Sequence, residues 1–223
     1  MLKLTTRALT NTLKDFGLDI ENWWDSTKDR YFASLKYGFD YVMKNEVITP
    51  HKHLLIMSGN LPDPTKVWEI SQSVTDALNE VKPVNEFDNY LNICPHPNTA
   101  ILEKAKNSGI NQVQYNLEVI GEEVFKKMCP GKMDYQLFKA KLIEAVNIMG
   151  FGNVRSNFVL GLQDPDELLE GISELADQGV VADYSIFQPK RATPLANYPT
   201  PSMDTIVYFT QKLVKIYKVS DWN

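Results

Sequence analysis

The sequence contains only two cysteines among its 223 residues, Cys94 and Cys129. Two thiols cannot form a framework of several disulfides or a metal site made of cysteines alone. The chain has no run of Lys or Arg and a net charge of −5, so nucleic acid is not an expected partner. No apolar stretch approaches the roughly 18–20 residues of a membrane span, and the N-terminus lacks a signal-peptide core. We therefore expect no membrane partner and a cytoplasmic location.

Several catalytic motifs are also missing. The sequence has no Gly-rich phosphate loop, no nucleophile elbow and no His-based zinc motif. Cys94 and His96 could supply two metal ligands, but no second pair of ligands stands at a zinc-like spacing. The residues therefore predict no metal site.

The sequence does contain apolar runs that alternate with amphipathic helices. Parallel strands need a crossover long enough to hold a helix, so this alternation predicts an α/β fold with a parallel sheet and outer helices. We find no linker and expect one domain over residues 1–223. Six strands fit either a partial (β/α)6 TIM-type barrel or an open doubly wound sheet. The strands are expected at residues 1–6, 53–57, 87–94, 113–119, 153–162 and 180–187.

Helical spacing of apolar residues and capping residues predict the helices. Thr65 is expected to cap one helix, Asp134 to cap a long helix that ends at Gly150, and Asp164 to open a third. Further helices are expected at residues 30–45, around 101–105 and at 203–217.

In such folds the functional site lies at the carboxyl ends of the strands. Ser58, Gly59 and Asn60 end the second expected strand, where a glycine lets the backbone approach a ligand closely. The alternative is an ordinary turn between a strand and a helix.

Two neighbouring strands share a pattern of polar residues. Asn116 and Glu118 are two residues apart and should share one face of a strand, and Arg155 and Asn157 repeat the pattern. Polar groups on one face of a central strand must line a wet cavity or be paired, because burying an unpaired carboxylate is costly. Glu118 and Arg155 could pair with each other, or could bind opposite ends of a zwitterionic small molecule.

Taken together, these segments resemble the radical SAM superfamily, nearest to its biotin synthase-like branch. The resemblance covers roughly residues 35–200 and favours the partial barrel, with S-adenosylmethionine across its open top. It implies that Ser58-Gly59-Asn60 holds the methionine amino group, that Glu118 and Arg155 contact the ribose and the methionine carboxylate, and that Gly161 lies near the adenine. The matching segments are His53–Asn60, Asn116-Leu117-Glu118, Pro130-Gly131-Lys132, Gly152–Asn157, Gly161-Leu162 and Phe187-Gln188-Pro189 with Thr193-Pro194-Leu195. Asn116, Asn157 and Gln188 are expected beside the same cofactor.

The chain departs from the family at its iron–sulfur cluster. Family enzymes bind a [4Fe–4S] cluster through three cysteines spaced C-x3-C-x2-C, whereas this chain has no cysteine before Cys94. The family spacing would place Thr10, Lys14 and Gly17 at the ligand positions, and cluster irons need thiolates.

Three hypotheses follow from these features. In the first, the chain is a cluster-less homologue, inactive alone in radical chemistry, that works as a binding protein or as a partner subunit. In the second, it is a fragment or split form of an active enzyme, and another segment or protein supplies the cluster ligands. In the third, a TIM-like enzyme uses Glu118 and Arg155 for acid–base chemistry. A carboxylate beside a guanidinium has a lowered pKa and is a poor general base near neutral pH, so the third ranks last.

Overall fold

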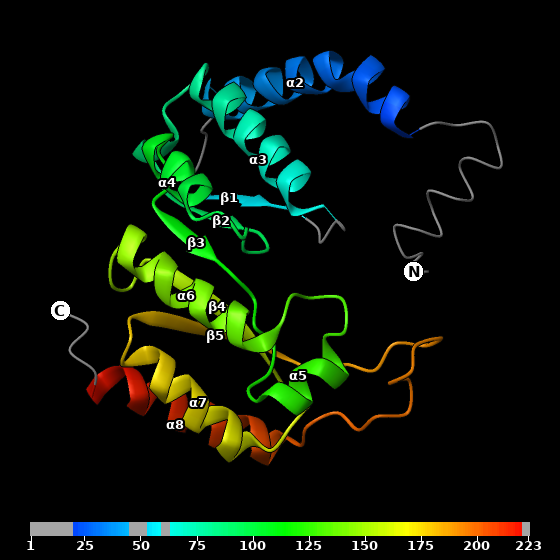
Figure 1. Ribbon diagram of the computed structural model, residues 1–223, viewed down its shortest axis with the longest axis vertical. Coiled ribbons are helices and arrows are strands. Elements are labelled where there is room, and N and C mark those ends of the chain that lie inside the picture. The colour runs from blue at the N-terminus through cyan, green and yellow to red at the C-terminus, as the bar shows by residue number, and fades with distance from the viewer. Residues whose placement is uncertain (1–19, 45–52, 59–62, 220–223) are drawn as a thin grey trace.

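Five parallel strands form one sheet in the computed structural model, which describes residues 20–44, 53–58 and 63–219 (Figure 1). The strands are β1 (His53–Met57), β2 (Asp88–Asn92), β3 (Gln112–Gln114), β4 (Val154–Leu160) and β5 (Val180–Ile186). The spatial order of the strands follows their order along the chain. A doubly wound sheet reverses its order at a switch point, so the partial TIM-type barrel is the confirmed alternative. The strand expected at residues 1–6 lies outside the described residues.

Helices connect these strands, as the alternating pattern predicts. The helix expected at residues 30–45 is the second half of a longer one that begins at Ile20. The helices are α2 (Ile20–Lys44), α3 (Pro64–Asn79), α4 (Ala100–Asn107), α5 (Glu122–Met128), α6 (Tyr135–Met149), α7 (Pro165–Ala176) and α8 (Met203–Val219), with a 3-10 turn at Val84–Glu86.

The helices pack against one face of the sheet and form the core with it. Alternate residues of β4, from Val154 to Leu160, are buried, among them Phe158 and Ser156. The residues between them, including Arg155 and Asn157, lie on the other face and are partly exposed. A two-residue period of burial places these polar side chains on the side of the sheet away from α6 and α7.

Aspartate side chains begin three of the helices. Asp134 and Asp164 cap α6 and α7, as the sequence predicts, and each carboxylate accepts two backbone N–H bonds. The predicted cap Thr65 is wrong, because Asp63 caps α3 by accepting the N–H of Thr65 at 2.9 Å. Pro64 occupies the first helical position, where its missing N–H costs nothing, and this moves the cap one residue before the proline.

Replacing Asp164 by alanine should lower the free energy of unfolding by about 1 kcal/mol, because the N–H groups of Asp166 and Glu167 lose their acceptor. Urea denaturation would measure the change. Asp164→Asn keeps a side-chain acceptor and should recover most of the loss; equal losses in both variants would contradict the capping role.

The fourth expected strand is shorter than predicted. Residues 113–119 were expected to be extended, but β3 ends at Gln114 and pairs with β4 only over Val113 and Gln114. The chain rejoins β4 through a bridge between Glu118 and Phe158. The N–H of Tyr115 still donates to the carbonyl of Arg155 at 3.0 Å, so the ladder is interrupted at residues 116 and 117.

Within the described residues, no helix is long and apolar enough to cross a membrane.

Candidate functional site

A small polar pocket lies at the carboxyl ends of the first three strands. Its volume is about 160 Å³. Ser58 follows β1, Asn92 ends β2, and Asn116 and Glu118 follow β3. The lining residues are Ser58, Asn92, Ile93, Cys94, Asn116, Glu118 and Lys132. This is the edge of a parallel sheet at which binding sites form.

Ser58 carries an unsatisfied polar atom at this pocket. Its backbone N–H donates to the carbonyl of Asn92 at 3.0 Å, which extends the β1–β2 ladder by one residue. Its Oγ is buried and has no hydrogen-bond partner among the described residues. Buried hydroxyl groups are almost always hydrogen-bonded, so an orphaned one that lines a pocket indicates a place for a polar ligand group.

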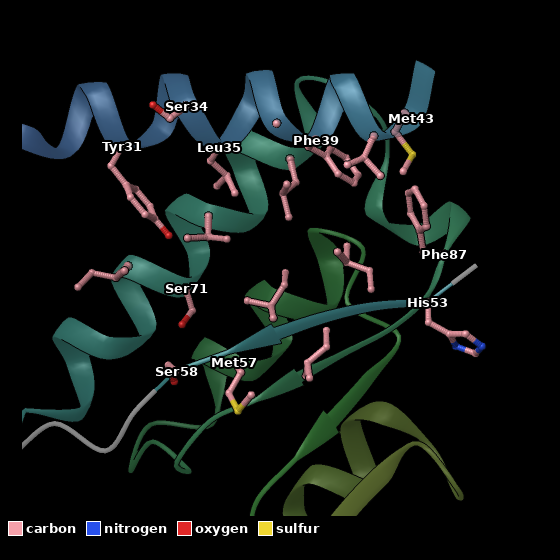
Figure 2. A pocket seen from close by; sticks show the side chains of 18 of the residues that line it. Tyr31, Ser34, Leu35, Phe39, Met43, His53, Met57, Ser58, Ser71 and Phe87 are labelled. Atoms are coloured by element: carbon pink, nitrogen blue, oxygen red, sulfur yellow. The ribbon is translucent and has the colours of Figure 1, made fainter. Parts of the chain in front are cut away.

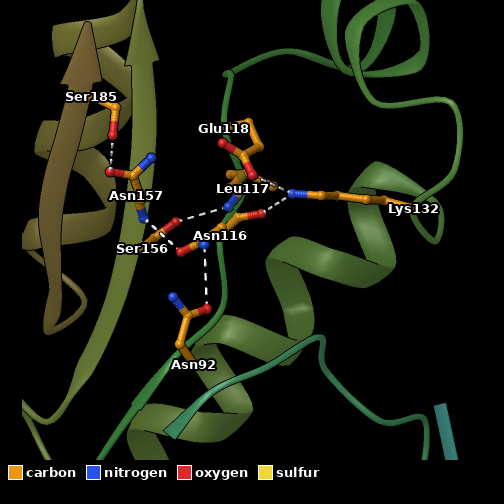
Figure 3. A network of polar contacts seen from close by, with 8 residues as sticks. All are labelled: Asn92, Asn116, Leu117, Glu118, Lys132, Ser156, Asn157 and Ser185. Carbon is orange, nitrogen blue, oxygen red and sulfur yellow. Dashed lines mark hydrogen bonds and ion pairs between the residues drawn. The ribbon is translucent and has the colours of Figure 1, made fainter. Parts of the chain in front are cut away.

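Where β3 is interrupted, side-chain oxygens accept hydrogen bonds from backbone N–H groups, in place of the backbone carbonyls of a regular ladder (Figure 3). The N–H of Leu117 donates to Ser156 Oγ at 3.0 Å, and the N–H of Asn157 donates to Asn116 Oδ1 at 3.2 Å. The other end of the Asn116 amide donates to Asn92 Oδ1 at 3.3 Å. The ladder resumes when the N–H of Glu118 donates to the carbonyl of Asn157 at 3.0 Å. The interruption thus points polar side chains into the pocket without leaving these backbone N–H groups unpaired.

Glu118 is held in an unusual backbone conformation. Its φ is +73°, in the left-handed region that non-glycine residues rarely adopt. Such conformations persist where the surrounding structure fixes them, and they cluster at functional sites.

Lys132 provides part of this fixation, although the sequence patterns did not predict it as a site residue. Its Nζ donates to Glu118 Oε1 at 2.8 Å and also to the carbonyl of Asn116. The Lys132 side chain is 13% exposed and that of Glu118 is 26% exposed, so the ion pair is largely shielded from water. The ammonium group also lies 5.7 Å from the ring centroid of Phe138. Residues 129–132 form a turn between α5 and α6, and Lys132 extends from this turn to the pocket.

Arg155 does not pair with Glu118, so the first of the two alternatives for these residues is wrong. Its Nη2 and Nε donate to the two carboxylate oxygens of Asp183 on β5, at 2.6 and 3.0 Å. These bonds raise the pKa of Arg155 above its usual value, although burial opposes the shift. The guanidinium carbon lies 5.7 Å from the ring centroid of Tyr90. The partners are 28 residues apart, on the neighbouring strands β4 and β5, and the register of these strands decides which carboxylate the arginine meets.

The other predicted site residues are spread over the same edge of the sheet. Asn157 accepts a hydrogen bond from Ser185 Oγ at 3.0 Å and lies beside Asn116. Gly161 follows β4 with a φ of +107°, and Gln188 is exposed in the loop after β5. Neither Gly161 nor Gln188 lines the pocket. Gly59 and Asn60 lie outside the described residues.

Comparisons with known proteins agree with this fold. No family model matches the chain. It is 31% identical over 175 residues to the bacteriochlorophyllide c C-7(1)-hydroxylase of Chlorobaculum limnaeum, an alignment that covers 73% of this chain and 43% of the relative. The [FeFe]-hydrogenase maturase HydG superimposes with a TM-score of 0.63 at 17% identity, over 84% of this chain and 42% of HydG. Coproporphyrinogen III oxidase (HemN) from Escherichia coli, a radical SAM enzyme, superimposes with a TM-score of 0.54 at 16% identity, over 85% of this chain and 45% of HemN.

The chain belongs to the radical SAM superfamily. It spans less than half the length of each of these relatives. The sequence resemblance and its partial barrel are thereby confirmed.

The pocket of this radical SAM chain fits part of S-adenosylmethionine by its chemistry. The amino acid end of S-adenosylmethionine carries an ammonium group and a carboxylate group. To bind it, a pocket needs a cationic and an anionic side chain, together with hydroxyl or carbonyl groups at close range. Lys132, Glu118 and the unpaired Ser58 Oγ provide this set.

The residues present do not fit the family's [4Fe–4S] cluster. Cys94 lies at the polar pocket and Cys129 at the end of α5, and neither forms a disulfide. Burial raises the pKa of Cys129, which lowers its thiolate fraction, and neighbouring Lys132 offsets this only in part. Among the described residues, no group of three His, Cys, Asp or Glu side chains could hold a metal ion. A cluster needs three thiolates in the family arrangement, and the chain contains two cysteines in all.

Proposed function

We propose that this chain is a cluster-less radical SAM protein that binds S-adenosylmethionine, or a ligand with the same zwitterionic end, without cleaving it. The observation that supports the proposal is the buried, unpartnered Ser58 Oγ at the polar pocket, in a chain with two cysteines. The protein would then act as a binding protein or as a subunit of a larger assembly.

Three side chains would hold the cofactor. The Ser58 hydroxyl group can donate a hydrogen bond to a carboxylate group or accept one from an ammonium group. Lys132 would attract the carboxylate, because its side chain lines the pocket and Glu118 and the Asn116 carbonyl use two of the three N–H donors of its ammonium group. Glu118 has a second oxygen, Oε2, that can accept a hydrogen bond from a ribose hydroxyl.

S-adenosylmethionine supplies a sulfonium whose reductive cleavage yields a carbon-centred radical when a reduced cluster donates the electron. The described pocket contains one cysteine, Cys94, and not the three thiolates that the cluster needs, so we assign no cleavage step to this chain.

A second candidate function is a split radical SAM enzyme whose cluster ligands come from another segment or polypeptide. Within the described ranges, β1 pairs with β2 alone and its other edge is free for a further strand. If this candidate holds, a protein partner completes the sheet, and chemistry of the kind named for the hydroxylase relative becomes available. A neighbouring reading frame with a C-x3-C-x2-C segment would favour it.

Anaerobic iron–sulfur reconstitution of the purified chain, with iron and sulfide counted, tests the first proposal. We expect no bound iron, and a saturable calorimetric titration with S-adenosylmethionine. Ser58→Ala should weaken that titration about fivefold to tenfold, the effect of one lost hydrogen bond. About four irons per chain, or no binding at any concentration, would overturn the proposal.

A further inference from the structure

Strand ends border the polar pocket on two sides, and their ladders end in different ways. On one side, Ser58 lies at the end of β1, opposite to His53 (Figure 2), and its backbone N–H extends the β1–β2 ladder. On the other side, Glu118 pairs with β4 through backbone groups, but the next residue that could pair, Ile120, bonds to a side chain instead. That side chain therefore shapes the Glu118 side of the pocket.

Gln163 completes the ladder with its side-chain amide. The N–H of Ile120 donates to Gln163 Oε1 at 2.7 Å, and Gln163 Nε2 donates to the carbonyl of Ile120 at 3.2 Å. In a continuing parallel ladder, Ile120 would donate to the carbonyl of Val159 and would accept from the N–H of Gly161. Gly161 instead has a φ of +107°, and the backbone leaves the strand there. An amide side chain has the same donor and acceptor as a peptide group, so Gln163 takes the place of the missing strand residue.

The side chain of Ile120 is held by the same part of the chain as its backbone. A Cβ added at Gly171 of α7 would lie 2.4 Å from Ile120 Cγ2, so the isoleucine packs directly on the backbone of this helix. Gln163 immediately precedes Asp164, the N-cap of α7. Ile120 is therefore fixed against the start and the middle of α7 by two separate contacts.

This anchor lies close to the strained residue of the pocket. Ile120 stands two residues after Glu118, and Val119 between them is fully buried. The φ of +73° at Glu118 is unfavourable for a residue with a side chain, so it persists only where the chain is fixed on both sides. The described lining of the pocket does not include Gln163, which can act on a ligand only through its neighbours.

We propose that Gln163 is a positioning residue of the polar pocket. Its amide holds Ile120 in place of a strand, and this holds the Glu118 carboxylate beside Lys132 and the pocket. Its role in ligand binding rests on the proposed function, whereas its effect on the backbone at Glu118 is present without a ligand.

Calorimetric titration with S-adenosylmethionine measures the effect on binding. Gln163→Met keeps the length of the side chain without its amide and should weaken binding about fivefold or more. Asn153→Leu is the matched control, because Asn153 donates through its own amide to the carbonyl of Met149 at 3.0 Å, at the opposite end of β4. Its affinity should stay within about twofold of the parent chain. Parent-like binding by Gln163→Met, or an equal loss in both variants, would overturn the proposal.

A double variant tests whether Gln163 acts through Glu118. Glu118→Gly removes the carboxylate, and glycine adopts a positive φ without strain. Adding Gln163→Met to Glu118→Gly should change the affinity by less than about twofold, because the group that Gln163 positions is already absent. A further loss as large as in the parent chain would contradict the positioning role, since it would arise elsewhere in the fold.

Amide hydrogen exchange of the ligand-free chain, followed by NMR, tests the same role without S-adenosylmethionine. In Gln163→Met, the N–H groups of Glu118 and Val159, which pair these two segments, should exchange at least about tenfold faster. The N–H of Tyr115, bonded to the carbonyl of Arg155 on the other side of the interruption, should keep its rate within about twofold. Unchanged rates, or equal acceleration of all three groups, would overturn the proposal. If the parent chain does not bind S-adenosylmethionine, the proposed function fails and the exchange rates alone decide the role of Gln163.

Discussion

Replacing Lys132 by methionine should weaken S-adenosylmethionine binding at least tenfold and lower the free energy of unfolding by about 2 kcal/mol. Methionine keeps the apolar contact with Phe138 but leaves the Glu118 carboxylate without its ammonium partner. The Asn116 carbonyl also loses its donor. Because Glu118 has a φ of +73° and is mostly shielded from water, the unpaired carboxylate should relax out of the pocket.

Calorimetric titration and urea denaturation of the same preparations would measure both effects. Lys132→Arg keeps the charge and should recover most of the stability, with binding reduced less than in the methionine variant. If methionine and arginine variants bind S-adenosylmethionine equally, Lys132 stabilises the fold but does not contribute to the pocket. A Glu118→Gln variant separates charge from shape, since it removes the charge but keeps an acceptor at Oε1.

Replacing Gly161 by alanine should cost about 2–4 kcal/mol of unfolding free energy, measured by urea denaturation. The φ of Gly161 is +107°, a conformation that side chains rarely adopt. An added Cβ would also lie 2.5 Å from Pro201 Cγ and 2.8 Å from Pro201 Cδ. The proline ring belongs to the segment before α8, so the clash would separate that segment from the end of β4.

The same variant discriminates between two roles of this glycine. The family resemblance gives Gly161 a role near the adenine, and in that case the variant should lose cofactor affinity as well as stability. A loss of stability with unchanged affinity would indicate that Gly161 serves only the packing against Pro201. Gly131→Ala is the control, because its added Cβ meets nothing within 4 Å, and its stability should change by less than about 0.5 kcal/mol.

The elements that depend on local sequence were predictable. Asp134 and Asp164 cap helices through bonds to residues two and three positions away, so a short window contains the whole interaction. The alternation of buried residues in β4 is equally local. The cap of α3 was misplaced by two residues, because Thr65 and Asp63 both have capping side chains and only the position of Pro64 decides between them.

Contacts between distant residues were not predictable from patterns. The end of β3 at Gln114 depends on Ser156, whose hydroxyl accepts the Leu117 N–H from 39 residues away. Arg155 meets Asp183 rather than Glu118 because of the β4–β5 register, which places Asn157 beside Asp183. Which carboxylate an arginine meets therefore depends on the arrangement of the strands in space and not on the spacing of residues along the chain.

The lining of the polar pocket was predicted in part. Strand-end reasoning located Ser58, Asn116 and Glu118 at one pocket, because parallel strands end at the same edge. The same rule applied to β2 would have found Asn92. Lys132 comes from a turn between helices, and its only signal was its place in the matching segment Pro130-Gly131-Lys132.

The sequential order of the strands also has a kinetic consequence. Each strand pairs with the strands just before and after it along the chain, so no pairing has to wait for a distant segment. Each pairing closes a loop that contains only one strand–helix unit. The entropy cost of closing a loop grows only slowly with the length of the loop. Folding can therefore start at any adjacent pair of strands and extend in either direction, as in a row of repeated units. A chain built in this way can change at one end of its sheet while the pairing at the other end is preserved.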